Sequence, residues 1–599
     1  MNRRRTLLVF AMILLLSAAL PVYGQRAEML PSGLPYGSLG ASIEEMFRAN
    51  EPESAALAVA VFNPDGILYQ NSLGYQDKEK QLPADESTVY EWGSISKLLV
   101  AVSVMQLWEE GLIDLDEDIQ NYLPPGYLSN LSYPDKVTIT DLLNHKGGFQ
   151  EGIADLFVAD RTRVTSLGGA LKEHPPAQIY RPGTVAAYSN WGIALAGYIV
   201  ELVTGIPYHE YVRNSILTPL TMENTAVAVD LSDNPWVASQ RQQLQGYDTN
   251  GKLMRNTRFY IPLYPAGSAT GTLEDLVKFA RALPLPATGE SRLFKERATH
   301  ERLLTATSWY GASGIPSNAH GLWSQLKAVP VIGHSGNTQG STSSLLFQPE
   351  TGLGAVVLTN QNMDRYYSEG IMEKVFGTFT DSPQADTERT LPEGLYRTAR
   401  TIKQGPLSIY SVLMLPMTEK DMDSFWAVDT SDGFTRVVYP YGDMVRVEPR
   451  EAILTLILVS LLAAGILYAL GTLIIGGLIL TPLSRRKARR TPGGASEALY
   501  PLKKSNYLTS ALILLWAGNA IFLAVRIFTF TPSSNYLWQI GLNGLIALVM
   551  IILLIYYMAP VRQKNLRTRD RVKTVLAAVF LTAAITAIFY WQMYAFWAI

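Results

Sequence analysis

Four long apolar stretches follow one another in the last quarter of this 599-residue chain. They cover residues 452–480, 508–530, 537–558 and 575–597, and each is long enough to cross a lipid bilayer as a helix. Inside hydrocarbon, a single segment satisfies its backbone N–H and C=O groups only by forming a helix. The sequence therefore predicts four transmembrane helices, and residues 25–450 are expected to fold in water beside them.

Positive charges in the connections predict the orientation of these helices. The loop after the first stretch and the loop after the third are rich in Lys and Arg, whereas residues 531–536 contain neither. Because basic loops stay on the cytoplasmic side, we expect residues 25–450 and the C-terminus to lie outside the cell membrane. The basic residues are Arg485, Arg486, Lys487, Arg489, Arg490, Lys503 and Lys504 in the first loop, and Arg562, Lys564, Arg567, Arg569, Arg571 and Lys573 in the second.

The N-terminus predicts export independently. Residues 1–24 combine a start rich in arginine, an apolar run over residues 6–20, and the small residues Val22 and Gly24 where a cleavage site needs them. We interpret this segment as a signal peptide, with an uncleaved membrane anchor as the alternative. The chain has no cysteine, which excludes disulfides, thiol catalysis and cysteine-ligated metals. Its net charge of −2 gives no reason to expect a nucleic-acid partner.

Strand patterns stand at both ends of the exported part, with helical patterns between them. Residues 55–62, a turn signal and residues 67–70 predict one β-hairpin, and residues 343–347 and 354–359 predict a second. Helical patterns include residues 96–110 and 194–204; in the first, Leu99, Val102 and Leu107 predict one core-facing side. We expect an α+β fold, with one antiparallel sheet built from both ends and a helical region inserted within it.

A second block of short strand patterns covers residues 391–448. Its segments 394–397, 410–415, 425–428 and 434–439 are separated by Gly, Pro and Asp. We predict a small β module that lies between the larger domain and the membrane helices.

Three short motifs, in a fixed order, predict the chemistry. The first is Ser94-Ile-Ser-Lys97, at the start of a helical pattern. Residues i and i+3 share one face of a helix, so the Lys97 amine can reach the Ser94 hydroxyl. A serine hydroxyl needs a neighbouring base, and lysine serves as one only when burial or nearby positive charge displaces its proton. The free N–H groups at a helix N-terminus can also stabilise an oxyanion.

The second and third motifs are Tyr188-Ser-Asn190 and His334-Ser-Gly336. The Tyr188 phenol can relay a proton between Ser94 and the leaving group, and Asn190 can hydrogen-bond the lysine and a substrate amide. His334 can hydrogen-bond Tyr188 or the substrate. Gly336 lets a substrate backbone lie against the preceding strand, residues 328–332, and the N–H of Asn337 is the expected second oxyanion donor.

Each motif alone is weak, because similar patterns occur elsewhere in the chain. Ser-x-x-Lys recurs at Ser324/Lys327 and Ser484/Lys487, and His-x-Gly recurs at His145/Gly147. Taken singly, Ser94 and Lys97 could be a helix cap, Tyr188 a core aromatic and His334 a loop residue. Only one ordered set of three fits the spacing and the context.

In this order the motifs resemble those of the penicillin-recognising serine hydrolases of the class C β-lactamase type, which include D,D-peptidases, D-aminopeptidases, esterases and β-lactamases. Similar stretches also occur at residues 142–148, 182–183, 265–267, 272–275 and 357–360. The resemblance covers residues 38–383. It implies the serine β-lactamase-like fold and a covalent acyl-enzyme on Ser94, with Lys97 and Tyr188 as the proton-transfer pair.

One departure bears on the substrate. His334 stands where β-lactamases and carboxypeptidases of this family usually carry lysine, which weakens the charge expected to hold a carboxylate. We therefore expect a peptidase or esterase acting on a small peptide, a D-amino-acid amide or an ester, anchored in the cell membrane, with no metal or cofactor. A further resemblance in layout is to exported peptidases with C-terminal membrane helices.

Other functions stay open at this point. A receptor for β-lactams or cell-wall fragments, acylated without turnover, is the main alternative, although the cytoplasmic loops are short. A true β-lactamase is a further alternative. A transporter is less well supported, because the spans contain few polar groups beyond Asn519, Arg526 and Asn543.

Overall fold

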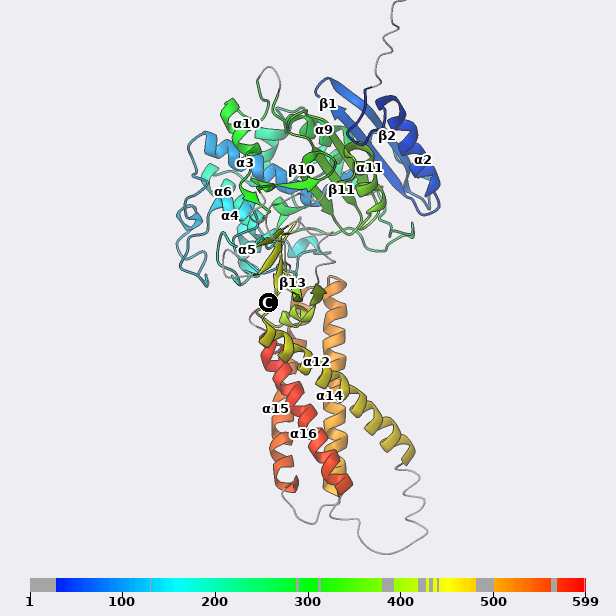
Figure 1. The fold of residues 1–599 in the computed structure, drawn as a ribbon, viewed down its shortest axis with the longest axis vertical. Coiled ribbons are helices and arrows are strands. Elements are labelled where there is room, and N and C mark those ends of the chain that lie inside the picture. Colours follow the sequence, from blue (N-terminus) through cyan, green and yellow to red (C-terminus); the bar gives the residue numbers. More distant parts are fainter. Residues whose placement is uncertain are drawn as a thin grey trace, which may run out of the picture.

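A globular domain stands on an elongated bundle of helices, with a small sheet between them (Figure 1). The computed structural model describes residues 28–129, 131–286, 290–310, 314–379, 393–417, 427–429, 435–438, 441–480, 500–561, 568–596 and 598. The predicted signal peptide, residues 1–24, lies outside the described residues, as do Arg485–Arg490 and the loop residues Arg562, Lys564 and Arg567. The predicted orientation in a membrane therefore stays a prediction.

The main sheet joins the two ends of the domain. Strand β1 (Ala56–Asn63) pairs antiparallel with β2 (Gly66–Asp77) on one side and with β12 (Gly354–Thr359) on the other. Both predicted hairpins and the single antiparallel sheet are confirmed. The nine strands run in the order β3-β2-β1-β12-β11-β10-β9-β8-β7. The remaining strands are β3 (Leu82–Pro83), β7 (Ser308–Trp309), β8 (Pro316–Ala319), β9 (Leu322–Leu326), β10 (Pro330–Asn337) and β11 (Thr342–Phe347).

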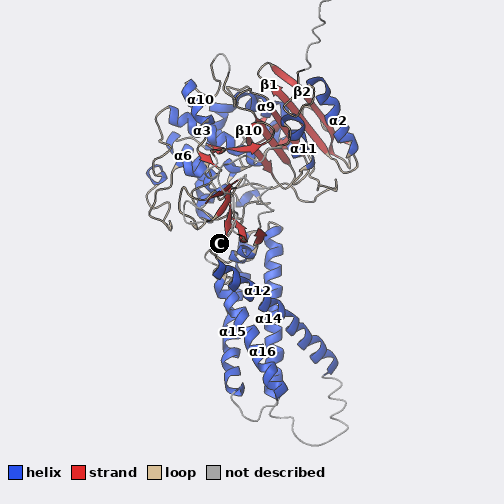
Figure 2. Cartoon of the chain, in the orientation of Figure 1, coloured by secondary structure: helices blue, strands red, loops and turns tan. Residues whose placement is uncertain are grey.

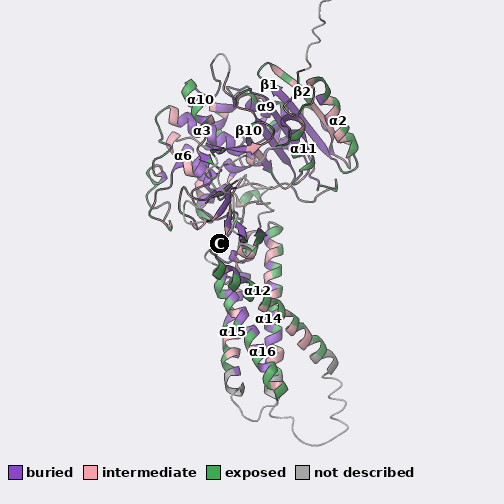
Figure 3. Ribbon diagram, in the orientation of Figure 1, coloured by how far each residue is buried: buried purple, intermediate pink, exposed green. Residues whose placement is uncertain are grey.

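Helices cover both faces of this sheet, so the strands are buried on each side (Figure 3). Alternation along β1 sends Leu57 and Val59 toward α2 (Leu39–Ala49) and α11 (Tyr366–Phe376), and Ala58 and Ala60 toward the opposite core. That second core contains α3 (Ser96–Glu109), α6 (Asn190–Thr204) and α9 (Leu273–Ala282). Shorter elements complete it: β4 (Val89–Glu91), β5 (Thr225–Ala226), β6 (Thr270–Thr272), α4 (Ile139–Leu143), α5 (Leu167–Glu173), α7 (Tyr208–Val212), α8 (Pro235–Arg241) and α10 (Arg297–Leu304).

The structure corrects the expectation that α3 has one core-facing side. Every residue of α3 from Ser96 to Leu107 is buried. Its polar side chains are satisfied internally: Ser103 donates to the Leu99 carbonyl, and Gln106 donates to the Leu293 carbonyl at 2.8 Å. The helix that carries the Ser94 motif is therefore a central helix, buried on every side from Ser96 to Leu107, rather than an amphipathic one.

A five-stranded sheet forms the predicted β module between the domain and the bundle (Figure 2). Its strands are β13 (Gly394–Thr398), β14 (Leu415–Met417), β15 (Ala427–Asp429), β16 (Arg436–Val438) and β17 (Met444–Arg446), in the order β14-β13-β17-β16-β15. The predicted strand at residues 410–415 is wrong, because Ser408–Val412 is a 3₁₀ helix. The Ser408 hydroxyl donates to the carbonyl of Trp591, directly after α16, at 2.7 Å, which joins this turn to the end of the helix bundle instead of to a strand.

Four helices of the described residues are long and apolar enough to cross a membrane. They are α12 (Pro449–Leu470), which continues as a π-helix over Gly471–Leu480, α14 (Tyr500–Phe528), α15 (Leu537–Val561) and α16 (Thr568–Tyr590). The first three predicted spans coincide with helices, whereas the fourth was placed too late, because α16 ends at Tyr590. Inside the bundle, Asn519 donates to Asn543 at 2.9 Å, so this polar pair joins α14 to α15.

Candidate active site

The three motifs meet at one cleft of about 440 Å³ in the globular domain. Ser94, Tyr188, Asn190, His334 and Asn337 all line it. Lys97 and Gly336 lie directly behind this surface, where Lys97 bonds Ser94 and the Cα of Gly336 abuts the Ser94 backbone. The structure therefore brings all seven predicted site residues together, and their catalytic roles stay predictions.

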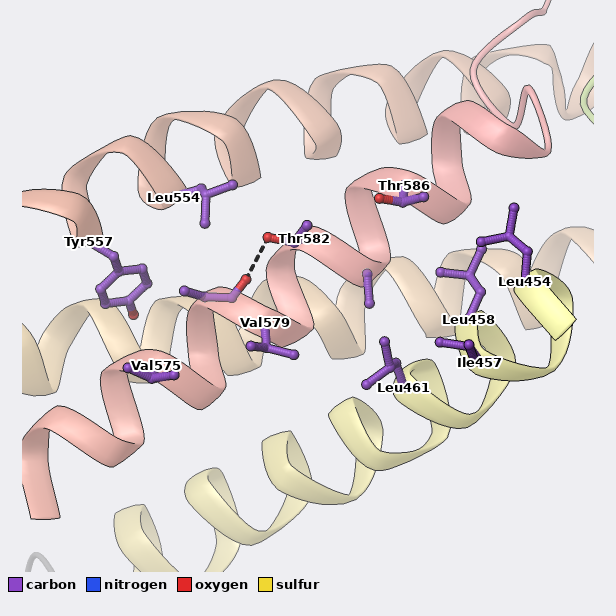
Figure 4. A pocket seen from close by; sticks show the side chains of 12 residues that line it. Leu454, Ile457, Leu458, Leu461, Leu554, Tyr557, Val575, Val579, Thr582 and Thr586 are labelled. Carbon is purple, nitrogen blue, oxygen red and sulfur yellow. Dashed lines mark hydrogen bonds between the residues drawn. The ribbon is translucent and has the colours of Figure 1, made fainter. Parts of the chain in front are cut away.

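A larger cavity, about 560 Å³, lies among the helices α12, α15 and α16 of the bundle (Figure 4). Leucine, isoleucine and valine side chains make up most of its wall. The hydroxyl of Thr582, which faces it, donates to the Ala578 carbonyl of its own helix at 2.9 Å (Figure 4). Its lining residues include no acid, base or activated nucleophile, so the candidate active site is the cleft at Ser94.

Ser94 lies in a 3₁₀ turn, Gly93–Ile95, immediately before α3. Gly93 adopts a φ of +51°, a left-handed conformation that favours glycine, and this bend directs the chain into the helix. The hydroxyl of Ser96 donates to the Gly93 carbonyl at 2.6 Å and holds the turn. Ser94 therefore lies at a helix N-terminus as predicted, within one short 3₁₀ turn before α3.

Lys97 lies in the first turn of α3, and its amine contacts three groups. The Nζ atom lies 2.8 Å from Ser94 Oγ, 2.8 Å from Asn190 Oδ1 and 2.6 Å from the Ala266 carbonyl oxygen. Burial, and then the charge of Arg400, lower the pKa of Lys97 well below its usual value. An uncharged amine has two N–H groups and one lone pair. These match two acceptors, Asn190 and Ala266, and one donor, the Ser94 hydroxyl.

The ring of Tyr188 is buried, and it contacts the His145 ring and the Lys97 amine. Its ring stacks on His145 with centroids 4.3 Å apart, and the Lys97 Nζ lies 5.0 Å from the ring centroid. Burial raises the pKa of Tyr188, while a hydrogen bond with Ser94 and the charge of Arg400 act to lower it. The phenol is therefore protonated at neutral pH and lines the same cleft as Ser94, where a proton relay would need it.

His334 lies inside strand β10, not after a strand as the sequence predicted. Its Nδ1 lies 2.6 Å from the Ser335 carbonyl oxygen, which accepts a hydrogen bond from it, and its ring centroid lies 6.1 Å from that of Tyr188. Burial, then the charge of Lys97, lower the pKa of His334 to about 3. Its Nε2 has no hydrogen-bond partner among the described residues. The imidazole is thus uncharged, and Nε2 is an acceptor rather than a cation.

Gly336 allows β10 to lie directly against the nucleophile. A Cβ at this position would stand 2.2 Å from the Trp92 carbonyl oxygen and 2.7 Å from the Ser94 backbone nitrogen. A Cβ on Gly93 would likewise stand 2.9 Å from the Asn337 backbone nitrogen. The backbone N–H groups of Ser94 and Asn337 are therefore close neighbours, the arrangement that an oxyanion hole needs.

Three residues that the sequence did not predict complete the site: Arg400, Tyr441 and Glu151. Arg400 and Tyr441 line the cleft but belong to the β module, so the module is more than a spacer before the helix bundle. The Arg400 Nε donates to the buried carboxylate of Glu151. Tyr441 accepts a hydrogen bond from Gln325 at 2.7 Å and donates to Ser335 at 3.3 Å.

The module reaches the cleft because its loops bond to the edge of the catalytic domain. Two hydrogen bonds join Asp443 and Ala186: the Asp443 N–H donates to the Ala186 carbonyl at 2.8 Å, and the Ala186 N–H donates to the Asp443 carboxylate at 2.9 Å. The N–H of Glu151 donates to the Thr401 carbonyl at 3.0 Å. Ala186 lies two residues before Tyr188, so these contacts hold the segment around Arg400 close to the Tyr188 motif.

One rim of the cleft also touches the loop between α14 and α15 of the helix bundle. Phe157, which lines the cleft, packs edge-on against Phe530 with ring centroids 5.1 Å apart. Asp155 accepts hydrogen bonds from the N–H and the hydroxyl of Ser533, at 3.1 and 2.5 Å. The ligand atoms of Asp155, Glu173 and His174 lie within 4.8 Å of one another, as in a metal site. Because Asp155 is already bonded to Ser533, we assign this carboxylate to the contact with the bundle.

Comparison with known proteins identifies the family. The profile of the family described as "Beta-lactamase" matches residues 47–370, which is more than half of the chain. The chain belongs to the beta-lactamase family. The match ends before the β module, so Arg400 and Tyr441 lie outside the part that the family shares.

Individual relatives are distant from this beta-lactamase-family protein. "Protein flp" of Staphylococcus aureus (strain MRSA252) is 25% identical over 305 residues, which cover 50% of this chain and 58% of the relative. The chain thus spans little more than half the length of the curated relatives it matches first. Among solved structures, a D-amino acid amidase from Ochrobactrum anthropi SV3 is 21% identical with a TM-score of 0.46, and covers 57% of this chain and 97% of its own. D-alanine carboxypeptidase AmpC from Burkholderia cenocepacia is 20% identical with a TM-score of 0.45, and covers 57% and 98%.

Proposed function

We propose that this protein is a membrane-anchored serine hydrolase that cleaves a small peptide, amide or ester through an acyl-enzyme on Ser94, with its cleft outside the cytoplasmic membrane. The observation that carries the proposal is the contact set of Lys97. Its amine is buried, has a lowered pKa and lies 2.8 Å from the Ser94 hydroxyl. A neutral lysine in this place is a base ready to accept the Ser94 proton.

The proposed acylation follows from these positions. Lys97 takes the proton from Ser94 as Oγ attacks the substrate carbonyl, and the backbone N–H groups of Ser94 and Asn337 stabilise the oxyanion. Tyr188, which lines the cleft with Ser94, gives its proton to the leaving group and then takes up the proton that Lys97 accepted from Ser94. The leaving group therefore departs on the side of the cleft where Tyr188 lies.

Deacylation uses the same groups in reverse. A water molecule takes the place of the leaving group beside Tyr188, loses a proton to the tyrosine–lysine pair and attacks the ester on Ser94. The uncharged His334 supplies an acceptor at Nε2 for a substrate N–H or for this water. All steps are proton transfers among side chains of this chain.

The proposed location rests on the membrane-length helices and on the charge distribution of their loops. Accessibility of a single introduced cysteine tests it, because the chain has none of its own. A cysteine at Ser534, in the loop after α14, is expected to react with a membrane-impermeant maleimide in intact cells. A cysteine at Ser496, in the loop before α14, is expected to react only after lysis. The reverse pattern would overturn the orientation.

A covalent probe tests the proposed chemistry. The full-length protein in detergent micelles is treated with a fluorophosphonate and, separately, with a fluorescent penicillin, and the adduct is mapped by mass spectrometry. We expect labelling at Ser94 with at least one probe and none in Ser94→Ala. Labelling without turnover of any peptide, amide or ester would favour the sensor alternative, and absence of any adduct would overturn the proposal.

A further inference from the structure

The cleft has one permanent charge among the described residues that line it, and that charge is Arg400. His334, which stands where related enzymes carry lysine, is uncharged because burial lowers its pKa to about 3. The amine of Lys97 lies below the surface of the cleft and bonds to Ser94, Asn190 and Ala266. No carboxylate of the described residues lines the cleft. The third motif has His334 in place of a lysine cation, and Arg400 of the β module supplies a cation to the same cleft.

Arg400 is held so that one edge of its guanidinium stays open. Its Nε donates to Glu151, whose other carboxylate oxygen accepts from the Gly152 N–H at 3.1 Å. The Glu151 side chain is only 6% exposed, whereas the Arg400 side chain is 44% exposed. Neither terminal nitrogen of Arg400 has a hydrogen-bond partner in the part of the chain that the structure describes. Glutamate thus anchors the inner edge, and the outer N–H groups face the cleft.

A guanidinium with two free N–H groups in one plane fits a carboxylate with two parallel hydrogen bonds. The position of Arg400 also indicates which part of the substrate carries that carboxylate. Its Cζ lies 4.9 Å from the centroid of the Tyr188 ring. Tyr188 is the residue that gives a proton to the leaving group in the proposed mechanism. A carboxylate bound there belongs to the leaving group.

We propose that Arg400 is the anion-binding residue of this active site and selects substrates whose leaving group carries a carboxylate. This proposal rests on the proposed hydrolase function and adds a substrate class to it. The selecting residue comes from the β module, outside the matched range 47–370, and it takes over the charge that His334 does not supply.

Two thioesters that differ in one charge test the assignment. The first is an N-acetyl-alanyl thioester of mercaptoacetate, and the second is the same compound with the mercaptoacetate as its methyl ester. Both are prepared in D and L forms, and thiol release is followed with the full-length protein in detergent micelles. The wild type is expected to prefer the carboxylate compound. The variant Arg400→Gln is expected to lose that preference by about ten- to a hundredfold, mainly through KM, because a hydrogen-bonded charge contributes that much. Arg400→Lys is expected to retain part of it.

Lys403→Gln is the matched control, since it removes a positive charge from the same segment. Its amine lies 5.0 Å from the Tyr180 ring and does not line the cleft, so the preference is expected to stay. Fluorophosphonate labelling of Arg400→Gln reports that the variant is folded. An equal loss for both thioesters would overturn the assignment and leave Arg400 acting only through Lys97 and Tyr188. Absence of both labelling and turnover in the wild type would instead overturn the proposed function.

Discussion

Arg400 covers the ring of Tyr188, with its guanidinium carbon 4.9 Å from the ring centroid. Arg400 follows strand β13 of the β module and Tyr188 precedes α6 of the globular domain, and they meet because a loop of the module bonds to the segment that carries the tyrosine. A cation over an aromatic face stabilises the ring position and the charge that develops on the phenol oxygen. The module next to the helix bundle is therefore also a wall of the candidate active site.

The first prediction concerns pH. Burial, followed by the charge of Arg400, lowers the pKa of Lys97, and the proposed base is the unprotonated amine. Activity therefore rises with pH as Lys97 loses its proton. Arg400→Gln removes one of the two causes, which raises the pKa of Lys97 and moves the acidic limb of the kcat/KM profile to higher pH.

The uncharged methyl ester thioester is the substrate for this measurement, because its binding does not depend on the carboxylate contact. Lys403→Gln is expected to leave the limb in place. The same position of the limb in Arg400→Gln and wild type would show that another group, not Lys97, controls the profile.

The second prediction concerns Tyr188→Phe. Loss of the phenol hydroxyl removes the proton relay while keeping the ring stacked on His145, so kcat is expected to fall by about 10²- to 10⁴-fold. Tyr90→Phe is the matched control, because Tyr90 is also fully buried in this domain and its hydroxyl has no partner among the described residues. Steady-state kinetics and thermal unfolding of both variants check the expectation. A control variant as impaired as Tyr188→Phe would attribute the loss to packing.

Local spacing explains why part of this site could be predicted from the sequence. Ser94 and Lys97 are one helical turn apart, so their contact is a property of the helix itself. Asn190 follows Tyr188 by two residues at a helix start, where Ser189 caps the helix by accepting a hydrogen bond from the Gly192 N–H at 3.0 Å. The order of the three motifs resembles that of a known family, and this resemblance predicted that the Ser94/Lys97 and Tyr188/Asn190 pairs meet in one fold.

Arg400, Tyr441 and Glu151 could not be predicted in this way, because their approach depends on how loops of the β module bond to loops of the globular domain. Of the two hydrogen bonds between Asp443 and Ala186, one joins two backbone groups and the other joins a backbone N–H to the Asp443 carboxylate, and such contacts leave no periodicity in the sequence. The burial of α3 was predictable in principle. Apolar residues occur on every side of this helix, whereas Leu99, Val102 and Leu107, on which the prediction was based, describe only one face.

The third prediction concerns Gly336→Ala. The added methyl group would stand 2.2 Å from the Trp92 carbonyl oxygen and 2.7 Å from the Ser94 nitrogen, so β10 or the Ser94 turn must move. We expect acylation to slow by about 10²-fold or more, as when an oxyanion donor is displaced. Gly37→Ala is the control, since a methyl group there meets no atom within 4 Å. Stopped-flow labelling with the fluorophosphonate measures the rate, and an unchanged rate would exclude this part of β10 from the oxyanion site.

The last prediction concerns the contact between the hydrolase domain and the helix bundle. Burial opposes ionisation of Asp155, but hydrogen bonds from His174 and Ser533 and the charge of Arg163 outweigh it and lower the pKa of this carboxyl. A carboxylate with a depressed pKa stabilises the folded state above its unfolded pKa of about 4. That contribution is lost as the pH falls from there through the folded pKa.

Asp155→Asn is therefore expected to weaken the contact at neutral pH by about 1.5–3 kcal/mol, the range for hydrogen bonds to a charged group. Hydrogen–deuterium exchange of residues 531–536 measures it, because the Ser533 N–H donates to Asp155. Asp160→Asn removes the same charge from the same loop, where the carboxylate bonds only within its own turn to Thr162, and serves as the control. The difference between wild type and Asp155→Asn is expected to be constant above about pH 5 and to shrink below pH 4. A difference that grows toward low pH would mean that the neutral carboxyl, not the carboxylate, makes this contact.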